Sequence, residues 1–300
     1  MSKPVEGVAV VGMGTMGTQI AMLAANAGYR VKVFDIRKRA FEETLQHFRQ
    51  TNVIESLVPL SRWQACKGKI QQLTDLDEAI RDAELVIEAI PENLDLKRRA
   101  FQELGQKAPP QAILATNSSS LPVSRLEESS GRPERCLNLH FYIGMDMADV
   151  MGGTRTLPEV MEKGINWVCS LGCIPLTVKK ELLGFCFNRV WRAVKREALH
   201  MWANGFVDFR DVDRAWMVFN GMKGGPRPFG PFGLMDQVGL DVIYAIEMVY
   251  YRDSGDPKDH PPEALKEKVD KNELGVKTGK GFYSYPDPEY LRADFLNPTG

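Results

Sequence analysis

Short apolar runs alternate with longer stretches of helical periodicity over the first two thirds of the chain. The run "GVAVVG" at 7–12, with its apolar residues bounded by glycine, predicts a buried strand. Similar runs predict strands at 30–35, 85–90, 112–116, 136–142 and 173–178, with helical patterns at 15–27, 38–50 and 93–107. Because strands separated by helices favour right-handed crossovers, we expect an α/β fold with a mostly parallel sheet. The segment 52–72 predicts no clear element.

The pattern changes near Gly184, after which no strand is predicted. Long helical stretches follow instead, at 185–204, 208–220 and 232–251. A loop rich in glycine and proline, 221–233, separates the last two stretches, and 273–290 is expected to be irregular. The sequence therefore predicts two domains, an α/β domain over 1–184 and an all-helical domain over 185–300.

Bulk properties exclude several classes of protein. The chain has 300 residues, of which 44% are hydrophobic, enough for more than one hydrophobic core. A formal net charge of −1 without a basic patch predicts no nucleic-acid partner. No apolar run approaches the roughly 20 residues of a membrane-spanning helix, so no membrane partner is expected. The N-terminal residues lead directly into a strand, which argues against a signal peptide.

The cysteines favour reduced thiols over a disulfide framework. There are five of them, an odd number, which fits a protein of the cytoplasm. Cys169 and Cys173 lie four positions apart, but no further Cys or His cluster could complete a zinc shell. We interpret both as buried thiols and predict no metal site.

The sequence "GMGTMG" at 12–17 predicts a dinucleotide-binding turn. Gly12, Gly14 and Gly17 have G-x-G-x-x-G spacing, and Met16 lies inside the turn. The pattern alone is weak, but here it follows a predicted strand and opens a predicted helix. Such glycines allow a tight turn, close approach of a pyrophosphate, and close packing of helix on strand. The helix N-terminus then offers free N–H groups to the phosphates.

Asp35 ends the next predicted strand, 18 positions after Gly17. A carboxylate there can accept hydrogen bonds from the ribose hydroxyls of the adenosine and would repel a 2′-phosphate. The cofactor is therefore expected to be NAD rather than NADP. Arg37 argues mildly the other way, because a nearby arginine could neutralise a phosphate.

A dehydrogenase that oxidises an alcohol needs a base near the hydroxyl, and histidine suits that task. The other three histidines lie in polar or helical segments, at His47, His200 and His260. Only His140 lies at the C-terminal end of a predicted strand, the edge where open α/β sheets bind ligands. From the residues alone, a catalytic base and a histidine at the edge of the core are equally well supported.

Serines in "ATNSSSLP" at 115–122 also follow a predicted strand. Spacing alone favours capping of a following helix over a catalytic role.

Several motifs, taken together and in order, resemble the NAD-dependent L-3-hydroxyacyl-CoA dehydrogenase family. They are "VVGMGTMG", "VFD", "VIEAIPENLDLK", "ATNSSSLP", "LHFY", "GFCFNR", "GPFGLMDQVGLD" and "KTGKGFYSY", which span nearly the whole chain. The resemblance implies a Rossmann-like domain followed by an all-helical domain that closes over the substrate and mediates homodimer formation.

The resemblance also implies roles for individual residues. Glu92 and Lys97 match residues that line the nicotinamide side of the cofactor site. His140 matches the catalytic base, and Ser119 matches a serine that hydrogen-bonds the reacting oxygen. Asn188 matches a substrate-orienting asparagine of the second domain.

This chain departs from the family pattern after His140. The family usually reads His-Phe-Phe-Asn-Pro from this histidine. Here Ile143 and Gly144 replace the Asn-Pro pair, and the loop to the next candidate strand, "ADVMGG", is shorter. The position of the family's glutamate, which orients the histidine, then falls on Asp149, one methylene shorter. Asp146 is the competing partner, and Asp149 is favoured.

The resemblance implies reversible NAD-dependent oxidation of a 3-hydroxyacyl-CoA, with fatty acid metabolism as the setting. One alternative is oxidation of a free 3-hydroxy acid or another small alcohol, and another is a non-catalytic cofactor-binding protein. The β-hydroxyacid dehydrogenases, which use a catalytic lysine, would need an arginine at Asp35 and are disfavoured. A basic group, Arg62, Lys67 and Lys69, could meet a CoA phosphate but is more simply a solvated face.

Overall fold

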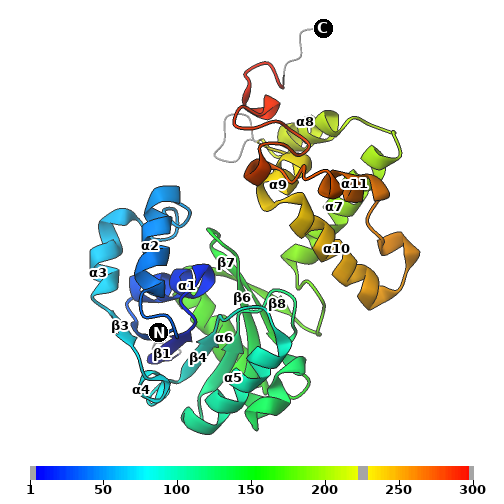
Figure 1. The fold of residues 1–300 in the computed structure, drawn as a ribbon. Helices are drawn as coiled ribbons and strands as arrows, with labels where there is room; N and C mark the ends of the chain where they lie inside the picture. The colour runs from blue at the N-terminus through cyan, green and yellow to red at the C-terminus, as the bar shows by residue number, and fades with distance from the viewer. Residues whose placement is uncertain (1–4, 222–228, 297–300) are drawn as a thin grey trace. The chain divides into compact units, whose positions relative to one another are not determined.

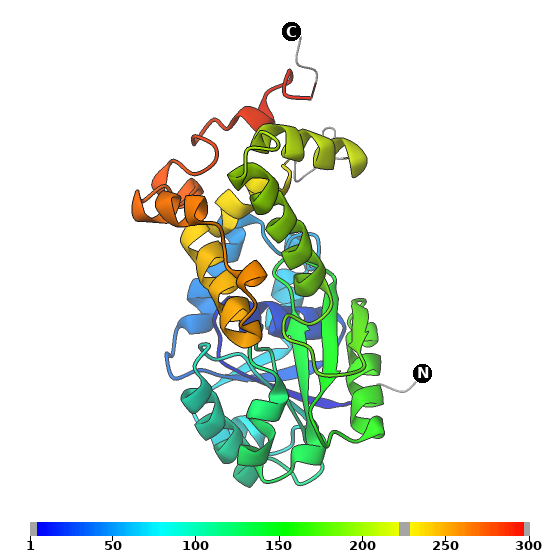
Figure 2. The ribbon, with the colours of Figure 1, turned by 90° about the vertical axis from the view of Figure 1, so that its right-hand side faces the viewer.

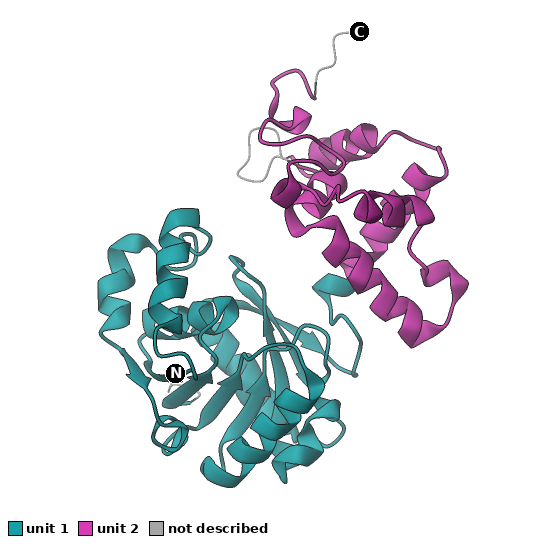
Figure 3. Ribbon diagram, viewed as in Figure 1, with its two compact units in different colours: residues 1–189 teal, residues 190–300 magenta. Residues whose placement is uncertain are grey.

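The computed structural model describes residues 5–221 and 229–296 and divides the chain into two compact units. Unit 1 comprises residues 1–189 and unit 2 residues 190–300 (Figure 3). The division falls inside helix α7, Phe187–Ala203, a few residues after the predicted boundary.

Unit 1 is built on one sheet of eight strands in the order β3-β2-β1-β4-β5-β6-β7-β8 (Figure 1). The strands are β1 Gly7–Val11, β2 Arg30–Phe34, β3 Ile70–Leu73, β4 Leu85–Glu88, β5 Ile113–Thr116, β6 Cys136–Phe141, β7 Met147–Gly152 and β8 Ile174–Val178. All neighbouring strands pair in parallel except β6 and β7, which pair antiparallel. The predicted α/β class and mostly parallel sheet are confirmed.

Two strands lie outside the apolar runs that predicted the other six. β3 falls in 52–72, and its two central glutamines are exposed, so no apolar run marks it. β7 was a candidate only through the family pattern, and it forms a hairpin with β6.

Helices cover both faces of the sheet (Figures 1 and 2), and alternate residues of the buried strands belong to two different cores. Val8 and Val10 belong to a core that includes residues of four helices: α1 Thr15–Asn26, α2 Ala40–Thr51, α3 Trp63–Lys67 and α6 Pro158–Ser170. Ala9 and Val11 belong to the core on the other face, with α4 Leu76–Ile80 and α5 Leu94–Lys107. Short 3₁₀ helices occur at η1 Leu60–Arg62, η2 Val123–Arg125, η3 Glu127–Ser130 and η4 Pro133–Arg135. Burial on both faces explains why the central strands read as continuous apolar runs.

Unit 2 is helical, as predicted. Its elements are the rest of α7, α8 Phe209–Phe219, α9 Pro231–Val238, α10 Leu240–Ser254 and α11 Glu263–Asp270, with η5 Pro257–Asp259, η6 Val276–Thr278 and η7 Glu289–Leu291. The single helix predicted over 232–251 is two helices, because Gly239 adopts φ +102° between α9 and α10. The short, polar α11 was not predicted. Most of the predicted loop 221–233 lies outside the described residues.

The irregular segment 273–290 is held to the helices of unit 2 by the buried Asp236. Asp236 of α9 accepts hydrogen bonds from the backbone N–H groups of Phe282 (2.9 Å) and Tyr283 (2.8 Å). Both aromatic rings belong to the core of unit 2. This segment therefore has only short 3₁₀ turns and isolated bridges as secondary structure, but it is packed.

The cysteines are all free, and three of them, Cys66, Cys136 and Cys173, are buried. The interpretation of Cys169 as buried is wrong, because it lies on an exposed face near the end of α6. Among the described residues, no group of three or more His, Cys, Asp or Glu side chains could hold a metal ion. No helix in the same part of the chain is both long and apolar enough to cross a bilayer.

Candidate active site

The glycine turn joins β1 to α1, and two of its glycines are required by the turn itself. Gly12 has φ +97°, and a Cβ there would lie 2.7 Å from the carbonyl oxygen of Ala89. A Cβ on Gly17 would collide with the carbonyl oxygen of Gly12. Gly14 differs, because a Cβ there would meet nothing within 4 Å. The backbone at Gly14 therefore presents open space to a ligand.

The N-terminus of α1 is chemically suited to an anion. Gly14 is its N-cap and provides no capping side chain, and no acidic residue lies in the first turn. The first N–H groups of a helix have no partner inside the helix, and its dipole places positive charge at that end. These residues fit the pyrophosphate of a dinucleotide.

Asp35 lies directly after β2 and braces the glycine turn. Its Oδ2 accepts a hydrogen bond from the backbone N–H of Met13 (2.7 Å), and its Oδ1 accepts one from that of Arg37 (2.7 Å). The carboxylate still borders the cavity described next. The Arg37 guanidinium lies 4.0 Å from Asp35 and 3.6 Å from Glu43. It therefore already faces two carboxylates.

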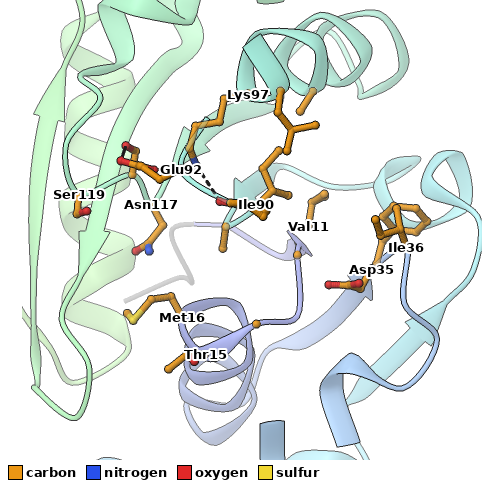
Figure 4. Close-up of a pocket in the computed structure, with 18 of the residues that line it drawn as sticks. Val11, Thr15, Met16, Asp35, Ile36, Ile90, Glu92, Lys97, Asn117 and Ser119 are labelled. Atoms are coloured by element: carbon orange, nitrogen blue, oxygen red, sulfur yellow. Dashed lines mark hydrogen bonds and ion pairs between the residues drawn. The ribbon is translucent and has the colours of Figure 1, made fainter. Parts of the chain in front are cut away.

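A cavity of about 810 Å³ runs along the C-terminal edge of the sheet (Figure 4). It is lined at the ends of β1 and β4, where the strand order reverses, the usual place for a ligand in such folds. Most of the residues predicted for the site line it: Gly12, Gly14, Met16, Asp35, Glu92, Lys97, Ser119 and His140. Gly17, Asp149 and Asn188 are not among its lining residues.

Lys97 is buried at the cavity wall and forms an ion pair that the sequence did not predict. Its Nζ lies 2.6 Å from Glu88 Oε1 and 3.3 Å from Glu92 Oε2. It also donates to the Ile90 carbonyl oxygen at 3.1 Å (Figure 4). Glu88 is fully buried and also accepts from the backbone N–H of Ile90 and the hydroxyl of Thr116. In the sequence, the sign of this ion pair was Glu88, a glutamate at the end of the otherwise apolar run "LVIE".

The carboxylate of Glu92 accepts hydrogen bonds from serines that follow β5. Ser118 donates its hydroxyl to Glu92 Oε1, and Ser120 donates both its hydroxyl (2.7 Å) and its backbone N–H (3.0 Å). The side chain of Glu92 is 38% exposed, and its partial desolvation would raise its pKa. The hydrogen bonds and the charge of Lys97 outweigh that effect and lower the pKa of Glu92. Glu92 is therefore a stable carboxylate in the cavity wall.

Ser119 differs from its neighbours, because it is exposed and lines the cavity. The alternative that these serines cap a following helix is wrong. The next helix is the short η2, and its N-cap is Pro122, which provides no side-chain hydrogen bond.

His140 and Asp149 face each other across the β6–β7 hairpin, where they are directly paired in the register. His140 Nδ1 lies 3.1 Å from Asp149 Oδ2, and Asp149 Oδ1 accepts the backbone N–H of Cys186 at 3.1 Å. Asp149 is fully buried. Asp146 is exposed in the loop before β7. Of the two candidate carboxylates, the structure brings Asp149 to the imidazole.

Two aromatic residues not singled out from the sequence enclose His140. The Phe185 ring stacks on the imidazole with centroids 4.8 Å apart, and the Tyr142 ring meets it edge-on at 4.4 Å. The Tyr142 hydroxyl donates to Asp149 Oδ2 at 2.5 Å. The sequence feature that could have pointed to this contact was Tyr142 itself, because the family pattern has phenylalanine at this position.

Asn188 lies at the start of α7, one residue before the end of unit 1 and close to the predicted domain boundary. It is half-buried, and its backbone is hydrogen-bonded to the Tyr142 hydroxyl. It therefore adjoins the His140 cluster.

The loop between β6 and β7 is held by α1. The buried side chain of Gln19 donates to the Tyr142 carbonyl oxygen (2.8 Å) and accepts the Gly144 backbone N–H (2.9 Å). Gly144 has φ +66°, and a Cβ there would lie 2.5 Å from the carbonyl oxygen of Val53. This fixed loop places Ile143 in the cavity lining.

The basic group near α3 contacts protein rather than an open site. Arg62 donates to the Asn26 carbonyl oxygen (3.3 Å) and Lys69 to that of Ala25 (3.4 Å), at the end of α1. Lys67 is exposed. Cations there complement the C-terminal end of the helix dipole.

Comparison with known proteins gives a consistent family. A family model described as "3-hydroxyacyl-CoA dehydrogenase, NAD binding domain" matches residues 7–182, and one described as "3-hydroxyacyl-CoA dehydrogenase, C-terminal domain" matches 184–285. A probable 3-hydroxybutyryl-CoA dehydrogenase from Deinococcus radiodurans is 32% identical over 286 residues, which cover 92% of this chain and 99% of the relative.

Other similar proteins act on different molecules. The 5-formyl-3-hydroxy-2-methylpyridine 4-carboxylate 5-dehydrogenase of Mesorhizobium japonicum is 28% identical over 293 residues, 96% of this chain and 93% of the relative. A solved structure of a diketoreductase, an enzyme of dicarbonyl compounds, is 36% identical with a TM-score of 0.79, covering 94% of this chain and 99% of that one. The two family models together span most of the chain, and the protein is an NAD-dependent oxidoreductase that belongs to the 3-hydroxyacyl-CoA dehydrogenase family.

Proposed function

We propose that the protein reversibly oxidises the 3-hydroxyl group of a 3-hydroxyacyl-CoA, with His140 as the base. The observation that carries this proposal is the buried His140–Asp149 pair at the cavity that also contains the glycine turn. A base with its orienting carboxylate and a dinucleotide-binding turn within one cavity is the combination that hydride-transfer chemistry requires.

The hydrogen bonds of His140 assign different tasks to its two ring nitrogens. Nδ1 faces Asp149, so a proton on Nδ1 is held by the carboxylate and Nε2 is left to accept the proton of the substrate hydroxyl. Asp149 then stabilises the imidazolium that forms. Ser119, exposed in the same cavity, would hydrogen-bond the reacting oxygen. NAD, when bound, supplies the hydride acceptor.

The other site residues would bind and orient. Gly12, Gly14, Met16 and Gly17 would form the pyrophosphate cradle, and Asp35 would hold the adenosine ribose. Glu92 and Lys97 would form the wall beside the nicotinamide, and Asn188 would orient the substrate. By the family resemblance, the helical domain over 185–300 would close over the substrate and form a homodimer, which light scattering after size-exclusion chromatography would test.

A second candidate is oxidation of a small alcohol without CoA. Ile143 places an apolar side chain in the cavity, where the family pattern has asparagine. The named substrates of the pyridine dehydrogenase and the diketoreductase also carry no CoA.

A direct assay separates the two candidates. NADH formation would be followed with (S)-3-hydroxybutyryl-CoA and, in parallel, with free (S)-3-hydroxybutyrate. The proposal expects kcat/KM to be much higher for the thioester, and equal or reversed values would favour the second candidate. His140→Ala should lower kcat by about 10²–10⁴-fold, the usual contribution of a general base. It should leave the Kd for NADH nearly unchanged, and full activity in this variant would contradict the role of His140.

A further inference from the structure

Tyr142 and His140 share one oxygen of Asp149. The Tyr142 hydroxyl lies 2.5 Å from Oδ2, and His140 Nδ1 lies 3.1 Å from the same atom. The remaining oxygen, Oδ1, accepts the backbone N–H of Cys186. Asp149 is fully buried, so these three protein groups take the place of water around the carboxylate.

We propose that Tyr142 is a positioning residue. It fixes Asp149 Oδ2 against His140 Nδ1 and reduces the electrostatic stabilisation that this carboxylate gives to the imidazolium. The inference rests on the proposed role of His140 as the base. It adds a third member to the His–Asp pair, one that acts on the reaction only through Asp149.

The position of the tyrosine is fixed from several sides. Gln19 holds its carbonyl oxygen, and its ring meets Phe187 edge-on with centroids 5.4 Å apart. Burial first, and then the hydrogen bond to Asp149 and the charge of that carboxylate, raise the pKa of the Tyr142 phenol well above its usual range. The hydroxyl therefore stays protonated at any working pH and acts as a permanent donor to Asp149.

A shared oxygen has a definite electrostatic consequence. An ionised carboxylate stabilises a neighbouring imidazolium, and a further donor on the same oxygen withdraws part of its negative charge. The titratable groups that contact His140 are Asp149 from β7 and Tyr142 from the loop after β6. Cys186, in the segment before α7, contacts Asp149 through its backbone N–H. Glu92 and Lys97 border the same cavity and pair with each other, and Asp35, Arg37, Arg99 and Glu103 line it too. Removal of the Tyr142 hydroxyl should therefore raise the pKa of His140.

The test is Tyr142→Phe, which restores the ring of the family pattern without the hydroxyl. The pKa of His140 would be measured by NMR titration of ¹⁵N-histidine-labelled protein, with the signal assigned by its loss in His140→Gln. We expect the titration midpoint to move to higher pH, because the carboxylate regains the negative charge that the phenol had withdrawn. The matched control is Tyr29→Phe, which removes another buried phenol of unit 1, hydrogen-bonded to Ser170 at 2.7 Å. It should leave the His140 titration unchanged.

A second substitution tests the opposite direction and does not depend on how well Tyr142→Phe folds. Incorporation of 3,5-difluorotyrosine at position 142 makes the phenol a stronger donor and should lower the pKa of His140. An unchanged pKa in both proteins, or a shift in the wrong direction in either, would overturn the proposal. The titration requires no substrate, so it remains decisive even if the CoA thioester is not turned over.

Kinetics give a further readout for the same variants. With (S)-3-hydroxybutyryl-CoA as the probe, the acid limb of the pH profile of kcat/KM for oxidation should move to higher pH in Tyr142→Phe. The limb reports the essential base of the free enzyme. A purely structural role would lower kcat/KM equally at all pH values and would contradict the proposal.

Discussion

Lys97 and Glu88 form a buried ion pair at the wall of the cofactor cavity, with 2.6 Å between Nζ and Oε1 and side-chain exposures of 1% and 0%. Removal of one member of such a pair leaves an uncompensated charge away from water. Lys97→Met should therefore lower the free energy of unfolding by about 3–5 kcal/mol, as measured by urea denaturation.

The control is the double variant Lys97→Met, Glu88→Gln, which removes both charges and keeps an acceptor for the neighbouring donors. It should recover part of the lost stability. A surface lysine, Lys107, pairs with two exposed carboxylates, and Lys107→Met should change stability little. If Lys97→Met lowered the free energy of unfolding as little as Lys107→Met does, the prediction that it leaves an uncompensated buried charge would be wrong.

The proposed carboxylate partner of His140 can be identified by two matched substitutions. Asp149→Asn should lower kcat by about 10²–10⁴-fold, because an amide at this position can hold the wrong tautomer and cannot stabilise the imidazolium. Asp146→Asn changes an exposed residue of the adjoining loop and should keep activity close to that of the wild type. Equal losses in both variants would argue against a specific role of Asp149.

Glu92 should make stability depend on pH in a defined direction. Its pKa in the folded state is lowered below the reference value of 4.5, despite partial desolvation, by the serine hydrogen bonds and by Lys97. A lowered acid pKa contributes stability above the unfolded value and loses it as pH falls through the folded pKa. The difference in free energy of unfolding between wild type and Glu92→Gln should therefore be largest near neutrality and shrink below about pH 4.5. A difference that grows on acidification would contradict this assignment.

Asp35 should determine the preference of the site for NADH over NADPH. Asp35→Asn keeps an acceptor for the backbone N–H of Met13 but removes the charge. The loss of a charge-assisted hydrogen bond to ribose, about 1.5–3 kcal/mol, predicts a rise of about tenfold or more in the Kd for NADH. Binding of NADPH should weaken less or improve. Asp82→Asn, in an exposed ion pair with Lys32, serves as the control and should bind NADH normally in the same fluorescence titration.

The sequence determined the features that depend on local backbone chemistry and on periodicity. Gly12, Gly14 and Gly17 could be recognised from their spacing between a predicted strand and a predicted helix, and the positive φ of Gly12 is a backbone conformation that glycine adopts readily. The central strands carry their burial on both faces as continuous apolar runs. His140 could be placed at the edge of the sheet because strand ends of a parallel sheet converge there, although its role required the family resemblance.

Only the tertiary structure decided which side chains meet. The antiparallel register of β6 and β7 places Asp149, and not Asp146, opposite His140, and a shift of one residue would turn Asp149 away. The same folding brings Tyr142 to that carboxylate and closes the Glu88–Lys97 pair. Such contacts depend on the register of the hairpin and on how the helices pack against the sheet. Both are set by the folded structure as a whole and cannot be read from a local pattern of residues.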